Sequence, residues 1–202
     1  VHRKIDPSKT VQVSTLLRLK TTPSLQPDGS VVLTDETRTR VTRFIEFLQS
    51  HTYPMTVSVQ PEIIEALATS TVDSDKALFV LLRDQLRQRS IATAPFVPTD
   101  PSMFAAMNIR EDFVEQLRVG EDTLNKWLPG VSIQRGTYIA DHYLTTEGIK
   151  LLRTAGVVSI ILTPRAQQKI SVSHSSNVVM RPNGLNSNNV SIIAVDAAVT
   201  TS

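Results

Sequence analysis

Short β-branched runs alternate with amphipathic helical patterns along most of this chain, and this alternation constrains its fold more than any other feature. Each strand-like run except the last is clearly followed by a segment with helical periodicity. Such alternation indicates parallel strands joined by right-handed helical crossovers, with any functional site at the carboxyl ends of the strands. The strand-like runs, which we expect to pair in parallel and in sequence order, are 11–19, 55–60, 91–97, 134–140 and 157–163.

The helical segments carry recognisable start signals and buried faces. Thr34 or Asp35 can cap the first helix, Pro61 suits the first turn of the second, and Thr145 can cap the last. Residues 100–107 and 109–128 form a short and a longer helical pattern, and Trp127 is expected in the core rather than as a platform for a sugar. Apolar residues at helical spacing, expected to be buried, are Val41, Phe44, Ile45, Leu48, Leu78, Leu81, Leu82 and Leu86.

The length of the chain limits how much of a barrel it can form. It has 202 residues, of which 41% are apolar, so it suits one domain of ordinary size. Four or five β/α units are too few for an eight-fold barrel, which takes about 250 residues. We therefore expect an α/β protein whose residues 1–202 form a single partial or incomplete (β/α) barrel, TIM-barrel-like, with parallel strands. The Ser- and Asn-rich stretch 165–190 is expected to be a loop or hairpin insertion before a final strand at 191–196.

Composition excludes several classes of function. The 21 basic and 19 acidic residues leave a net charge of +2, and they are scattered rather than gathered into the basic stripe that nucleic acid requires. The absence of cysteine removes disulfides, thiolate chemistry and sulfur-ligated zinc. No apolar run approaches the roughly 20 residues of a membrane span. We expect no nucleic-acid partner and no membrane span within this segment.

Polar side chains at the strand ends are the candidate site residues. Asp100, Asp141 and Asp196 are the catalytic candidates, because retaining glycosidases need two carboxylates about 5 Å apart and inverting ones roughly 6.5–9.5 Å. An aspartate before a proline is also a preferred helix cap, which is the structural alternative for Asp100. The residues that we predict as binding candidates at the same mouth are Gln60, His142 and Tyr143.

Signals for metals, nucleotides and nucleophiles are missing. The four histidines are scattered, with no pair at the spacing of a zinc site, so we expect neither a metal nor another cofactor. No nucleophile elbow of the form G-x-S-x-G and no glycine-rich phosphate loop occurs among the seven glycines.

Several phrases, which together cover about residues 14–164, resemble a known family. They are PDGSVVLTDE, MTVSVQPEIIEAL, APFVPTDPSMFAAM with the downstream REDFVEQLRVGEDTL, and GTYIADHYLTTEGIKLLRTAGVVSIIL. The chain resembles a family of exported actinobacterial proteins of unknown function that are encoded near the lipid II flippase. Members of that family are similar to the glycoside hydrolase/deacetylase superfamily of (β/α) barrels. Two positions depart from the pattern: Gln60 stands where the family tends to have aspartate before proline, and Tyr138 stands where a tryptophan is common.

The resemblance implies a location and a range of functions. It implies a segment of a longer exported protein, placed outside the cytoplasm in the cell envelope. The favoured function is a non-catalytic ligand-binding or interaction domain, with a cell-wall glycan as the natural ligand at the strand ends. One alternative is a carbohydrate-active hydrolase, glycosidase- or deacetylase-like, that uses the strand-end carboxylates. Another is a scaffold for envelope-assembly proteins. The missing carboxylate at Gln60 weakens a hydrolytic role for that position.

Overall fold

The protein forms an open α/β sheet that curls into part of a barrel. The structure, a computed structural model, describes residues 15–167, 179–180 and 191–194. In this part the strands lie in the order β1-β2-β3-β4-β5-β7-β6. Their bounds are β1 (Thr15–Arg18), β2 (Met55–Ser58), β3 (Ser90–Thr93), β4 (Ser132–Ala140), β5 (Ser159–Leu162), β6 (Val179–Met180) and β7 (Ser191–Ala194).

The pairing confirms the predicted parallel order. β1 to β5 pair in parallel in sequence order, and β7 adds a sixth parallel strand beside β5. Among the strands of the described residues, β6 alone runs antiparallel, against β7. The strands are shorter than most of the sequence patterns, and residues 11–14 of the first pattern lie outside the described residues. The result is a partial, TIM-barrel-like (β/α) fold.

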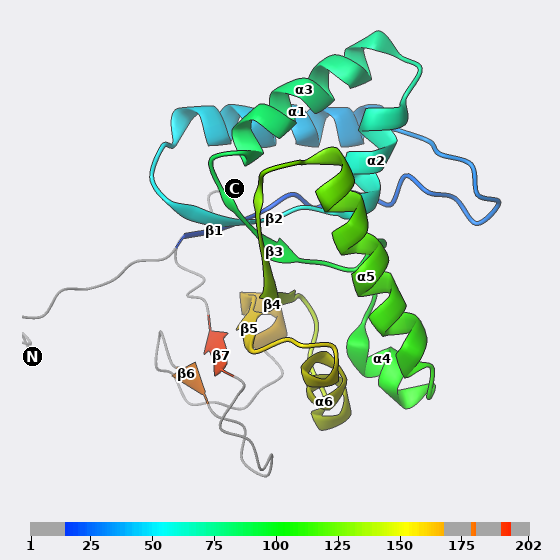
Figure 1. Ribbon diagram of the computed structural model, residues 1–202, viewed down its shortest axis with the longest axis vertical. Coiled ribbons are helices and arrows are strands. Elements are labelled where there is room, and N and C mark those ends of the chain that lie inside the picture. Colours follow the sequence, from blue (N-terminus) through cyan, green and yellow to red (C-terminus); the bar gives the residue numbers. More distant parts are fainter. Residues whose placement is uncertain (1–14, 168–178, 181–190, 195–202) are drawn as a thin grey trace, which may run out of the picture.

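The helices follow one another around one side of the strands, as Figure 1 shows. In the figure α1 and α3 lie side by side, and α5 runs along the neighbouring part of the molecule toward α4. None of the described helices is both long and apolar enough to cross a membrane. Their bounds are α1 (Asp35–Ser50), α2 (Pro61–Thr69), α3 (Asp73–Leu86), α4 (Pro101–Ala106), α5 (Arg110–Trp127), α6 (Thr146–Thr154) and α7 (Pro164–Gln167).

Local sequence signals set the helix ends. The Thr34 side chain accepts a hydrogen bond from the Thr37 backbone N–H, and Thr145 does the same for Gly148, so both predicted caps are confirmed. Pro61 occupies the first turn of α2, where its missing N–H costs nothing. Gly156, with φ of 89°, follows the end of α6 in the left-handed region that glycine tolerates best.

The core lies between the strands and the helices. All four of the apolar residues predicted for α1 are buried, and so are Leu82 and Leu86 of α3. Leu81 is a wrong prediction, because its side chain is 47% exposed. It lies beside the buried stripe of α3 rather than in it. Trp127 is partly buried, packs edge-on against Phe79 and lies outside the cavity described below, as expected of a packing residue.

A glycine on α5 fixes the carboxyl end of β3 against the helix. A Cβ at Gly120 would lie 2.3 Å from the backbone oxygen of Ala94. The Phe96 N–H donates to the Gln116 carbonyl of the same helix, at 2.8 Å. The segment that follows β3 is therefore held in place by backbone contacts, and this segment forms part of the site.

Candidate functional site

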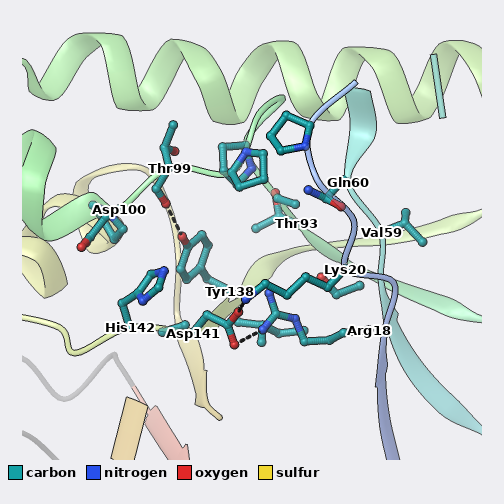
Figure 2. A pocket seen from close by; sticks show the side chains of 18 of the residues that line it. Arg18, Lys20, Val59, Gln60, Thr93, Thr99, Asp100, Tyr138, Asp141 and His142 are labelled. Atoms are coloured by element: carbon teal, nitrogen blue, oxygen red, sulfur yellow. Dashed lines mark hydrogen bonds and ion pairs between the residues drawn. The ribbon is translucent and has the colours of Figure 1, made fainter. Parts of the chain in front are cut away.

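The carboxyl ends of β1 to β4 surround a cavity of about 500 Å³. This mouth cavity lies where parallel (β/α) folds place their functional sites. Much of its lining is apolar and comes from the strand ends and the segment after β3, with Val59, Ala94, Pro95, Ile139 and Ala140 among the residues. Figure 2 shows the polar side chains that surround this lining. An apolar lining with a few converging polar groups is typical of a binding site for a small molecule.

Asp141 is held by two cations from the edge strand β1 and the residues just after it. It follows β4, yet it accepts a hydrogen bond from Arg18 of β1 and another from Lys20 Nζ at 2.8 Å. Because β2 and β3 lie between these strands, the contact closes across the curled sheet, and the dashed lines in Figure 2 mark it. Burial alone would raise the pKa of Asp141, but Lys20 and Arg18 outweigh it and hold the pKa below its usual value.

A second polar group lies on the far side of the cavity in Figure 2. Asp100 caps α4 by accepting a hydrogen bond from the Ser102 N–H at 2.8 Å, which confirms the capping alternative. The buried Tyr138 hydroxyl donates to the Thr99 carbonyl at 3.4 Å. Burial, together with the charges of Asp100 and Asp141, raises the pKa of Tyr138, so the phenol stays protonated. His142 also lines the cavity, with an exposed side chain.

Gln60 lines the cavity, but its amide is engaged in a structural role. Its Oε1 accepts hydrogen bonds from the Thr21 N–H at 2.8 Å and from the Thr21 hydroxyl at 2.7 Å. Its Nε2 donates back to the Thr21 carbonyl at 3.3 Å. The side chain therefore ties the segment after β1 to the end of β2, and it shapes the wall of the cavity.

A buried carboxylate that was not predicted from the sequence reinforces the same wall. Glu62, in the first turn of α2, is 2% exposed and accepts hydrogen bonds from the backbone N–H and the hydroxyl of Ser24. Burial raises the pKa of Glu62, although the Ser24 hydrogen bonds partly oppose the shift. Thr21, Thr22 and Pro23, which precede Ser24, line the cavity. The acid directly after Pro61, followed by two isoleucines, was the only signal in the sequence.

The Glu62→Gln variant should change how stability depends on pH. Because the folded-state pKa is raised above the unfolded value of about 4.5, ionising Glu62 costs stability as the pH rises through the folded pKa. Wild-type stability should therefore contain a component that is largest below pH 4.5 and falls toward neutral pH. Urea unfolding between pH 4 and pH 7.5 should show a flatter profile for Glu62→Gln. An identical pH slope in the two proteins would show that Glu62 is not the group responsible.

The structure brings most of the predicted site residues together. Gln60, Asp100, Asp141 and His142 all line the mouth cavity. Tyr143 is 45% exposed and is not among the lining residues, and its backbone carbonyl accepts a 3.4 Å hydrogen bond from Ser102. Asp196 lies outside the described residues, as does most of the stretch 165–190.

Two cationic residues of the site were not predicted. Arg18 and Lys20 belong to the end of β1 and the residues just after it, and both line the cavity. Lysine and arginine after a strand are common on protein surfaces, so the sequence offered no signal that distinguished them. In the described residues Arg18 Nε and Thr99 Oγ1 are buried without a hydrogen-bond partner. Buried polar atoms are normally paired, so these two atoms are exceptions to the usual pattern.

Within the described ranges no three His, Asp or Glu side chains come together in a group that could hold a metal ion. Asp141 has its oxygens on cations, and Asp100 has one on a backbone N–H. The chemistry that the described residues offer is therefore hydrogen bonding and charge, around a protonated phenol.

The comparisons with known proteins concern the fold. No family model and no curated protein matches the sequence. A solved structure, the 4-α-glucanotransferase from Thermococcus litoralis, is similar with a TM-score of 0.58 and 15% sequence identity. The match covers 91% of this chain and 27% of that one, so the chain spans about a quarter of the length of the solved protein. At this identity the likeness supports the partial (β/α) barrel and leaves the chemistry to be argued from the mouth cavity.

Proposed function

We propose that this chain is a glycan-binding domain of an exported cell-envelope protein, and that it holds a sugar in the mouth cavity without cleaving it. The observation that carries the proposal is the cavity of about 500 Å³ at the strand carboxyl ends, apolar in its lining and polar at its edges. Sugar rings present both an apolar face and a set of hydroxyl groups, which suits such a lining.

Two further observations support a saccharide ligand. The Arg18 and Lys20 side chains are 27% and 55% exposed and line the cavity, so their N–H groups can donate to sugar hydroxyls. The solved structure with the similar fold is a glucanotransferase, which is a carbohydrate-active enzyme. The location in the cell envelope rests on the resemblance of the sequence phrases, and a cell-wall glycan is the ligand that such a location would supply.

The state of the described carboxylates supports binding without cleavage. Hydrolysis of a glycosidic bond needs one carboxylic acid that donates a proton and one carboxylate that acts as a nucleophile or base. The lowered pKa of Asp141 keeps it ionised beside Arg18 and Lys20, so it is a poor proton donor. Asp100 is occupied as the cap of α4. The described residues thus favour recognition over catalysis.

Calorimetric titration with soluble cell-wall glycan fragments tests the proposal. Wild type should bind at millimolar concentration or better, and Thr22→Leu should weaken binding several-fold, because Thr22 is exposed and lines the cavity. Thr71→Leu places the same change on an exposed residue between α2 and α3 and should bind like wild type. No binding by wild type at millimolar concentration would remove the glycan proposal and leave the scaffold, for which the exposed Val80 and Leu81 of α3 are the apolar surface.

The hydrolase alternative has one observation in its favour, since Asp100 and Asp141 line the same cavity. Two substitutions of Asp100 separate a cap from a catalytic group. Asp100→Asn keeps a capping side chain and should leave stability nearly unchanged, whereas Asp100→Ala should cost about 0.5–2 kcal/mol of stability. Prolonged incubation of wild type with the glycan, followed by chromatography, should show no cleavage. Cleavage that is lost in Asp100→Asn would establish the hydrolase instead.

A further inference from the structure

We infer that the mouth cavity selects a saccharide that carries a carboxylate, and that Lys20 and Arg18 recognise this group. The inference rests on the proposed glycan-binding function and specifies the chemical class of the ligand. It starts from the arrangement around Asp141, where two cationic side chains meet one carboxylate.

The Arg18–Lys20 pair already holds a carboxylate in this structure. Asp141 Oδ1 accepts from Arg18, and Asp141 Oδ2 accepts from Lys20 at 2.8 Å, so each oxygen has its own cationic donor. Charge-assisted hydrogen bonds of this kind are the strong ones in proteins. The geometry shows that the pair can bind a carboxylate at this edge of the cavity, because it already binds the carboxylate of Asp141.

The pair retains capacity for a second anionic group. The two cations together carry one positive charge more than Asp141 neutralises. The Arg18 side chain is 27% exposed and the Lys20 side chain is 55% exposed, and each has only one described ion pair. An ammonium has three donors and a guanidinium five, so unused N–H groups remain on both. Acceptors on a ligand would satisfy them.

Asp100 is the other carboxylate that lines the cavity, and its negative charge does not offset the excess positive charge at the end of β1. Asp100 accepts from the Ser102 N–H and lies across the cavity from Lys20 in Figure 2. The mouth cavity therefore has a cationic side at the end of β1 and an anionic side at the start of α4. A saccharide with its carboxylate toward β1 and hydroxyl donors toward Asp100 would match both sides.

Matched pairs of sugars test the inference. Each pair differs in a carboxylate-bearing group: glucuronic acid with glucose, and N-acetylmuramic acid with N-acetylglucosamine. Titration of wild type, monitored by calorimetry or NMR, should show that the acidic sugar of each pair binds roughly tenfold tighter than the neutral sugar. Raising the NaCl concentration from 0.05 to 0.5 M should reduce this preference, because screening weakens exposed charges most.

Two lysine variants locate the preference. Lys20→Met keeps an unbranched side chain without the charge, and it should bring the affinity for the acidic sugar close to that for the neutral one. Lys76→Met is the control, because Lys76 on α3 is 53% exposed and paired with Asp73, much as Lys20 is 55% exposed and paired with Asp141. The control should keep the full preference of wild type.

The outcomes distinguish this inference from the proposed function. Equal binding of the acidic and neutral sugars by wild type would overturn the carboxylate preference while the glycan-binding function stands. A preference that survives in Lys20→Met would overturn the assignment to the Arg18–Lys20 pair. Binding of no sugar in either pair or in the larger glycan fragments would overturn both proposals together.

Discussion

The Gly120→Ala variant should be about 3 kcal/mol less stable than wild type, one of the two largest losses that the structure predicts. The added Cβ would lie 2.3 Å from the Ala94 oxygen and 2.9 Å from the Phe96 nitrogen, both backbone atoms that cannot rotate away. Alanine in a helix is otherwise about 1 kcal/mol better than glycine, so the clash must exceed that gain. For a domain of this size the loss corresponds to a fall in melting temperature of roughly 6–12 °C, measurable by calorimetry.

The matched control is Gly148→Ala in the first turn of α6. There the closest atom is the Ser102 hydroxyl oxygen at 2.5 Å, the end of a side chain that can change rotamer, although two Ser102 backbone atoms lie at 3.0 Å. We expect a smaller loss than at Gly120. A Gly120→Ala protein as stable as wild type, or more stable, would contradict the close packing of α5 against the end of β3. It would also mean that α5 does not hold Ala94 and Pro95 in place at the wall of the cavity.

The Asp141→Asn variant should lose about 1–3 kcal/mol of stability, because it leaves the partly buried Arg18 guanidinium without its anionic partner. The loss should depend on pH. The pKa of Asp141 is lowered in the folded state, so its stabilising contribution is present above the unfolded pKa of about 3.8 and disappears as the pH falls through the folded pKa. Urea unfolding should therefore separate the two proteins at pH 7 and bring them together in strong acid.

An exposed ion pair provides the comparison for Asp141. Asp122 also pairs with an arginine, Arg118, but its side chain is 62% exposed, so Asp122→Asn should change stability by less than about 0.5 kcal/mol. Equal small effects of the two substitutions would mean that the Arg18–Asp141 contact contributes no more than a surface pair. The closure of the sheet across β2 and β3 would then have to come from backbone and apolar contacts alone.

The sequence predicts the architecture well because the signals for it are local. Alternating strand and helix patterns need only neighbouring residues, and so do the caps at Thr34 and Thr145. The prediction for Leu81 was wrong because both Leu81 and Leu82 fit helical spacing from Leu78. Periodicity alone does not decide which of two adjacent leucines faces the sheet when both continue the same pattern.

The candidate site was only partly predictable, for a related reason. The rule that functional groups gather at strand carboxyl ends predicts a shared position for Asp100, Asp141 and His142, and all three line the cavity. The partners of these groups depend on the tertiary structure. Arg18 and Asp141 are 123 residues apart in the chain, and only the curl of the sheet brings them together. Without that contact the sequence leaves the role of Asp141 open between catalysis and structure.

We propose above that the mouth cavity binds a saccharide and releases it without cleavage. An NMR titration of ¹⁵N-labelled wild-type protein with soluble cell-wall glycan fragments tests it most directly. We expect amide shifts to concentrate at the strand ends, in residues 18–22, 93–94 and 138–142, while the glycan spectrum shows no cleavage over hours. Shifts confined to the exposed face of α3, or the appearance of cleaved glycan, would contradict it.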